Sequence, residues 1–216
     1  MQKFECTAIL FDLDGVLVDS TAAVGRAWHR WALQHGLEPN AVVHAAHGRR
    51  TVETMRDMAP HLDAAAEARK MENEEARDMD GVTVIPGADH LLRSLPDGQW
   101  AIVTSGTRTM ATARLRDTGH LVPQVLVTAD DVVDGKPHPE PYLKGAAGLG
   151  IAPELCVVFE DAPAGIRAAH AAGMRVIALK TTFRQEELQE AEATVTDFRE
   201  VQVTRNANGK LEILLP

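Results

Sequence analysis

Cysteine is scarce in this chain of 216 residues, which contains only Cys6 and Cys156. Both lie inside apolar runs, where a buried thiol acts as a small hydrophobic side chain, so no disulfide framework is expected. Long hydrophobic runs are also lacking. The most apolar N-terminal stretch, residues 7–18, contains Asp12 and Asp14 and is too short to cross a bilayer. No signal-peptide pattern precedes it, so we expect a cytoplasmic protein.

Positive charge is in deficit as well. The chain has 22 Lys and Arg against 31 Asp and Glu, a formal net charge of −9. Such a surface repels nucleic acid and anionic lipid, so neither is an expected partner, and a small anionic substrate would need a local island of positive charge. The hydrophobic share of 45% and the charged share of 25% are ordinary for a globular protein. We expect a monomer.

What is present is an alternation of apolar runs and helical patterns. Five short runs without polar alternation predict buried strands at residues 7–11, 100–104, 123–128, 155–159 and 175–179. Helical spacing follows three of them, at residues 107–118, 140–149 and 162–172, and a glycine suited to a helix C-terminus follows each helix. This order predicts an α/β fold with a doubly wound, mostly parallel, Rossmann-like sheet.

One region interrupts the alternation directly after the first strand. Residues 20–84 contain no strand-like run but do contain helical patterns at 22–35, 51–58 and 64–79. Trp28 and Trp31 have the spacing of a packed interior, whereas residues 64–79 are mostly charged and are interpreted as a solvated helix face. We therefore expect a small helical cap domain over residues 20–84 and a core domain over 1–19 and 85–216. A terminal hairpin is predicted from residues 201–203 and 211–213.

The strongest chemical signal is a pair of carboxylates, Asp12 and Asp14, where the first strand ends. Strand periodicity places side chains two residues apart on the same side. In open α/β sheets, ligands bind at the carboxyl ends of the strands. A pair of acids in this position, flanked by apolar residues, indicates a functional site.

Further polar residues follow the later strands. They are Thr104, Ser105 and Gly106 after the second predicted strand, Lys136 after the third, and Glu160 and Asp161 after the fourth. Clustered carboxylates without His or Cys favour Mg²⁺. A lysine, a hydroxyl and free backbone N–H groups favour a phosphate. Metal and phosphate together indicate phosphoryl transfer.

These motifs, in this order, resemble the haloacid dehalogenase superfamily of phosphotransferases, with the insert resembling its small α-helical cap. Longer stretches, such as GKPHPEPYLKG at 135–145 and FEDAPAGI at 159–166, are similar to glycerol-phosphate and 2-deoxyglucose-6-phosphate phosphatases. The resemblance implies a Mg²⁺-dependent phosphatase of small phosphorylated sugars or polyols that works through an aspartyl-phosphate.

The resemblance also implies roles for individual residues. Asp12 would be the nucleophile and Asp14 the general acid and base. Phosphate would be bound by Asp12, Thr104, Ser105, Gly106 and Lys136, and metal by Asp12, Asp14, Glu160 and Asp161. In the cap, Arg50 and His47 are candidates for contacting the substrate. Arg49 stands where close relatives often place an aromatic residue.

Three alternatives stay open. A sugar phosphomutase of the same superfamily would need a second basic phosphate site in the cap, which Arg49 and Arg50 could supply. A non-catalytic, receiver-like phosphate-binding module would lack the second carboxylate and the cap. A dehalogenase would use neither the Asp14 acid nor the metal cluster, so it is the weakest alternative.

Overall fold

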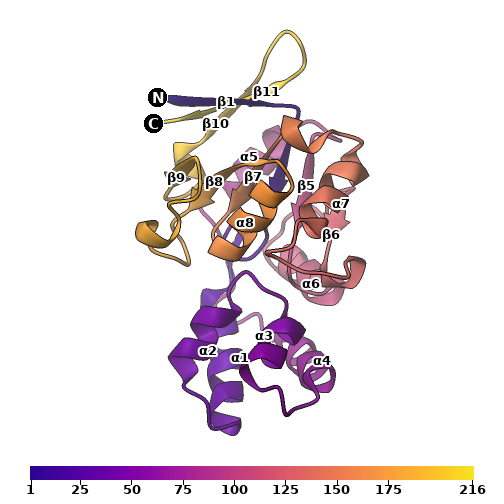
Figure 1. Ribbon diagram of the computed structural model, residues 1–216. Coiled ribbons are helices and arrows are strands. Elements are labelled where there is room, and N and C mark those ends of the chain that lie inside the picture. Colours follow the sequence, from indigo (N-terminus) through magenta and orange to yellow (C-terminus); the bar gives the residue numbers. More distant parts are fainter.

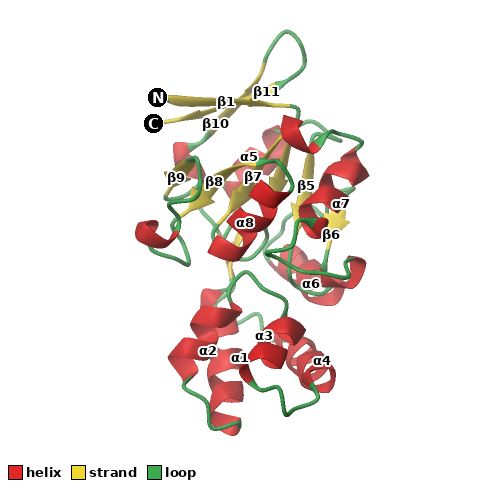
Figure 2. Ribbon diagram, viewed as in Figure 1, coloured by secondary structure: helices red, strands yellow, loops and turns green.

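The computed structural model describes residues 1–216, and its centre is a six-stranded parallel sheet (Figures 1 and 2). The strands, in spatial order, are β6 (Leu126–Val127), β5 (Trp100–Val103), β2 (Ala8–Phe11), β7 (Cys156–Glu160), β8 (Arg175–Leu179) and β9 (Ala193–Val195). The fully apolar sequences of the central strands follow from their position, because helices cover both faces. The predicted α/β, doubly wound fold is confirmed.

Two helices cover each face of this sheet. α5 (Ala88–Ser94) and α6 (Arg108–Asp117) contribute to one hydrophobic core, and α7 (Glu140–Leu149) and α8 (Pro163–Ala171) contribute to the other. The glycines expected at the helix C-termini, Gly119, Gly150 and Gly173, all adopt positive φ. The chain therefore leaves each helix where the sequence indicates.

A separate helical lobe lies beyond one end of the sheet (Figure 1). It consists of α1 (Thr21–Gln34), α2 (Pro39–Ala46), α3 (Thr51–Met58) and α4 (Ala64–Glu75), which share their own buried cluster. Trp28 and Trp31 are both in this cluster, with ring centroids 5.5 Å apart, as their spacing predicts. β3 (Val18–Asp19) and β4 (Thr83–Val84) pair where the lobe joins the core. The domain boundaries at 19/20 and 84/85 stay a prediction.

A three-stranded antiparallel sheet stands at the opposite end of the molecule, where both termini lie (Figure 1). Its order is β1 (Gln2–Cys6), β11 (Leu211–Leu215) and β10 (Gln202–Arg205). The predicted terminal hairpin is present as β10 and β11. The predictions did not include β1, which pairs with β11 over its whole length.

Several other boundaries differ from the predictions. The third predicted strand is only two residues long, and the helix expected over 64–79 ends at Glu75. β9 and α5 were not predicted, because each is too short for its periodicity to stand out. α2 was also not predicted, although it is as long as the predicted α3. The start of α2 does carry a local signal, because Glu38 at the N-cap is followed by Pro39 at the first helical position. In the structure, the Glu38 side chain accepts hydrogen bonds from the N–H groups of Asn40 and Ala41. None of the helices is both long and apolar enough to span a membrane.

Candidate active site

Most of the polar residues identified in the sequence line one cavity between the carboxyl ends of the strands and the helical lobe. Asp12 follows β2, Thr104, Ser105 and Gly106 follow β5, and Asp161 follows β7, and all line this cavity together with Asp14. Counting its open mouth, the cavity encloses about 590 Å³, which is the size range of sites for small molecules. The tertiary structure thus brings together residues that lie up to 149 positions apart (161 − 12).

Lys136 lies beside Asp12 as a fully buried cation and, like Glu160, does not itself line the cavity. Its Nζ donates to Asp12 Oδ1 at 2.5 Å and to Glu160 Oε1 at 2.7 Å, and it also donates to the carbonyl of Val103. Burial alone would lower the pKa of Lys136, but the two carboxylates raise it above its usual value. The lysine is therefore held as a cation beside Asp12.

Burial raises the pKa of Asp12 to about 7, and the charge of Lys136 opposes this shift. Burial and the neighbouring Glu160 and Asp12 carboxylates likewise raise the pKa of Asp161 well above its usual value. Buried like charges raise each other's pKa in this way when too little positive charge is nearby. The oxygens of Asp12, Glu160 and Asp161 lie within 4.8 Å of one another. This acidic cluster could hold a divalent cation, and its all-oxygen donor set fits a hard ion.

Glu160 differs from the other two acids because hydrogen bonds already occupy both of its oxygens. Oε1 accepts from Lys136 and from Tyr142 Oη, at 2.9 Å. Oε2 accepts from the backbone N–H groups of Asp161 and Ala162, at 2.8 and 2.9 Å. The carboxylate is fully buried, so it holds Lys136 and the start of α8 in place.

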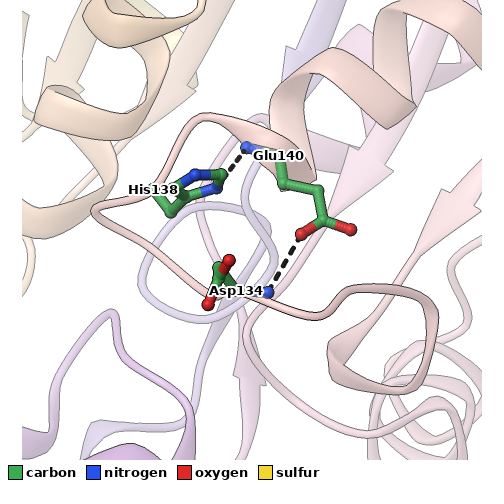
Figure 3. A group of neighbouring side chains, drawn as sticks. All are labelled: Asp134, His138 and Glu140. Atoms are coloured by element: carbon green, nitrogen blue, oxygen red, sulfur yellow. Dashed lines mark hydrogen bonds between the residues drawn. The ribbon is translucent and has the colours of Figure 1, made fainter.

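The loop that carries Lys136 is fastened by the residues around it (Figure 3). The Glu140 carboxylate accepts from the backbone N–H groups of Val133 and Asp134, and Glu140 N donates to His138 Nδ1 at 3.3 Å. The Asp134 N–H, the Lys144 ammonium and the Val133 N–H together lower the pKa of Glu140 to about 2. Asp134, His138 and Glu140 come within ligand distance of one another, but the Glu140 oxygens are already occupied, so this cluster orders the loop.

The cap touches the core through the turn that follows α2. The Gly48 carbonyl accepts a hydrogen bond from Ser105 Oγ at 3.0 Å. Gly48 has φ +77°, and a Cβ there would lie 2.5 Å from the Cβ of Ala162. Only glycine allows the backbone to approach the core this closely. The neighbouring His47 lines the cavity.

The two cap candidates are placed differently. Burial lowers the pKa of His47, whose Nδ1 donates to Val43 O at 2.7 Å and whose buried Nε2 has no partner. Arg50 does not line the cavity; its guanidinium bonds Glu53 and the carbonyls of Val132 and Val133. Arg50 therefore joins the cap to the loop before Lys136, and the expectation that it faces the substrate does not match its position.

Among the cavity-lining residues to which the sequence analysis gave no role are Ser20, Glu75, Arg114 and Thr182. Thr182 follows β8, so its place at a strand end was the available signal. Ser20 Oγ donates to Asp14 Oδ1 at 2.6 Å, and Arg114 NH1 donates to the same oxygen at 2.5 Å. Glu75 is only 4% exposed, which corrects the interpretation of its helix as a uniformly solvated face.

The family model for haloacid dehalogenase-like hydrolases matches residues 6–173. The chain belongs to this family, and the resemblance drawn from the four motifs is confirmed. It is 43% identical to hexitol phosphatase A of Escherichia coli strain K12 over 213 residues, or 96% of this chain and 99% of that protein. It is 38% identical to glycerol-1-phosphate phosphohydrolase 2 of Saccharomyces cerevisiae over 200 residues, or 87% of this chain and 80% of that protein.

A solved structure is also similar over nearly the whole fold. It is the β-phosphoglucomutase of Clostridium difficile, with a TM-score of 0.79 and 25% identity, covering 91% of this chain and 93% of that one. The likeness extends over both the core and the helical lobe. It also shows that the same architecture occurs in a protein named as a mutase.

Proposed function

We propose that this protein is a Mg²⁺-dependent phosphatase of small phosphorylated sugars or polyols. One observation carries the proposal: Asp12 and Asp14 face a single small cavity, with the buried Lys136 cation held against Asp12. The names of the relatives, a hexitol phosphatase and a glycerol-1-phosphate phosphohydrolase, support the substrate class.

In the first step, an Asp12 carboxylate oxygen attacks phosphorus and the ester P–O bond breaks. The electron pair of that bond leaves on the alkoxide, which takes a proton from Asp14, giving the free alcohol and an aspartyl-phosphate. General acid help of this kind contributes roughly 10²–10⁴ in rate. The Ser20 and Arg114 hydrogen bonds orient the Asp14 carboxyl.

In the second step, water attacks the aspartyl-phosphate while Asp14 removes its proton. The bond between phosphorus and the Asp12 oxygen breaks, so inorganic phosphate leaves and both aspartates return to their starting states. Phosphoryl oxygens are bound by Thr104, by the N–H groups of Ser105 and Gly106, and by Lys136. In the structure, Gly106 N donates to Thr104 Oγ1 at 3.0 Å, so this N–H would exchange that partner for the phosphate.

The acidic cluster fits Mg²⁺, which we propose is held by Asp12, by the backbone carbonyl of Asp14 and by Asp161. Glu160 would hold the metal less directly, because its own oxygens are already hydrogen-bonded. When bound, Mg²⁺ supplies positive charge that offsets the repulsion between a carboxylate and a phosphate.

The mutase alternative needs a second phosphate site in the cap. Arg49 lines the cavity, but its guanidinium already pairs with Asp57 at 2.7 Å. Arg50 is bound by Glu53 and by loop carbonyls. The phosphatase is therefore the better-supported function. Incubation with a hexose phosphate separates the two, because a phosphatase releases free phosphate and a mutase produces an isomer without release.

The test is a phosphate-release screen over glycerol phosphates, 2-deoxyglucose 6-phosphate, hexitol phosphates and hexose phosphates, with Mg²⁺ and with a chelator. We expect release only with the metal. Asp12→Asn should lower kcat by at least about 10³ while its circular dichroism spectrum matches that of the wild type. Turnover retained by Asp12→Asn would exclude the covalent route. A monomeric state and a cytoplasmic location stay predictions.

A further inference from the structure

The cavity is lined by two buried, oppositely charged side chains whose polar atoms are not all satisfied. Arg114, on α6 of the core, is 2% exposed, and its Nε and NH2 have no hydrogen-bond partner. Glu75, the last residue of α4 in the cap, is 4% exposed, and its Oε1 has no partner. Both line the cavity that contains Asp12 and Asp14.

Such unpaired groups are unusual, because leaving a buried polar group without a partner costs about 1–3 kcal/mol, and more when it is charged. α4 packs against α6, yet the two charges form no ion pair with each other; the only ion pair of Arg114 is with Asp14. The unpaired donors of Arg114 and the unpaired acceptor of Glu75 therefore suit a ligand group that accepts from one side chain and donates to the other.

A hydroxyl group has this dual character, since its oxygen accepts from a guanidinium while its O–H donates to a carboxylate. A second phosphate group does not, because it would meet the like charge of Glu75. An alkyl chain would leave both groups unsatisfied. We infer that Glu75 and Arg114 form a hydroxyl-binding site that selects polyol and sugar phosphates over other phosphate esters.

The site also links substrate choice to the cap. Glu75 comes from the inserted lobe, whereas Arg114 comes from the core and holds Asp14 through its other nitrogen. A substrate hydroxyl bound by both residues joins the two lobes. Only the Arg114 side chain then separates it from Asp14, the acid that protonates the leaving group. The inference rests on the proposed phosphatase function and names the feature by which that site recognises its substrates.

Matched pairs of substrates test the inference. Glycerol 1-phosphate is compared with n-propyl phosphate, and sorbitol 6-phosphate with n-hexyl phosphate, so that only the hydroxyls differ. We expect the wild type to prefer at least one hydroxylated member tenfold or more in kcat/KM. Glu75→Met keeps the length of the side chain but lacks the acceptor. It should reduce that preference at least tenfold by raising KM for the polyol phosphate, with alkyl phosphate turnover changed less than twofold.

The matched control is Glu74→Met, which alters the exposed neighbour of Glu75 on the same helix and should leave both substrates unchanged. If Glu75→Met does not fold, Arg114→Lys replaces it, because lysine keeps a charge near Asp14 but loses the free guanidinium donors. The polyol-to-alkyl ratio is again the measured quantity, so a general loss of activity through Asp14 does not mimic the expected result.

The outcomes separate the two hypotheses. If the wild type hydrolyses polyol and alkyl phosphates equally well, or if Glu75→Met slows both equally, the hydroxyl site is wrong while the phosphatase function stands. If no phosphate ester is hydrolysed with Mg²⁺ present, the phosphatase function fails and this inference fails with it.

Discussion

At the residue scale, the site depends on a chain of buried hydrogen bonds behind the nucleophile. Tyr142 donates to Glu160, which holds Lys136, which holds Asp12. All four side chains are at most 4% exposed. In so dry an environment, each charge depends on the next for compensation, because removing one partner leaves another buried and unpaired.

Tyr142→Phe tests this chain by removing one donor without changing the shape of the side chain. Hydrogen bonds to charged groups stabilise proteins by about 1.5–3 kcal/mol, so we expect a loss of this size in the free energy of unfolding, measured by urea denaturation. KM should change little, because Tyr142 does not line the cavity. An unchanged unfolding midpoint would contradict the chain.

Glu75 makes a separate prediction about pH. Burial raises its pKa from 4.5 to about 7, with the Arg114 charge opposing the shift. The folded state therefore binds the proton more tightly than the unfolded state. The stability that this gives is fully present below about pH 4.5 and is lost as the pH rises to about 7.

Glu75→Gln removes this titration. In the absence of substrate, the variant should gain stability relative to the wild type between pH 5 and pH 8, by up to about 3 kcal/mol. Urea denaturation at the two pH values measures the gain. A difference between the two proteins that does not vary with pH would contradict it.

At the element scale, the start of α8 determines the position of Glu160. A Cβ added at Gly165 would lie 1.6 Å from Glu160 Oε1, so only glycine lets the first turn of this helix pack against the buried carboxylate. A glycine inside a helix usually lowers the stability of the protein. Here it allows the close approach that keeps Glu160 in contact with Lys136.

Gly165→Ala should therefore displace Glu160 and misplace Lys136. A misplacement of about 1 Å in a catalytic site costs about 10²-fold in rate, which is the fall in kcat/KM that we expect. The control is Gly25→Ala in α1, where nothing lies within 4 Å of the added Cβ. It should raise stability by about 0.5–1 kcal/mol and leave kcat/KM unchanged. Equal kinetics for the two variants would refute the argument.

At the scale of the whole molecule, the antiparallel sheet joins the two ends of the chain. β11 is its central strand, and Leu211, Ile213 and Leu215 alternate inward to join the main core. Because β1 leads directly into β2, this sheet connects the C-terminus to the strand that precedes Asp12.

Ile213→Ala should lower the free energy of unfolding by about 2–5 kcal/mol, the usual loss for this truncation in a core. Glu212→Gln is the matched control: it alters an outward side chain of the same strand that pairs with Lys3, and such surface pairs contribute at most about 1 kcal/mol. Both are measured by urea denaturation. Similar losses for the two variants would show that β11 does not stabilise the core through Ile213.

The sequence by itself determined the parallel sheet, the helical insert and several of the polar residues that line the site. These features are visible locally, because buried parallel strands need unbroken apolar runs and polar residues at their ends stand out against them. It also located Asp12, Asp14, Thr104 and Asp161, which share one cavity.

Only the tertiary structure decided how distant segments meet. β1 pairs with a strand from the far end of the chain, and its own pattern does not reveal that partner. Arg50 contacts a core loop instead of the cavity, and Glu75 from the cap lines the same cavity as Arg114 from the core. A charged side chain on an amphipathic helix has the same local pattern whether it faces water or a buried partner. The packing of the lobes therefore decides its role.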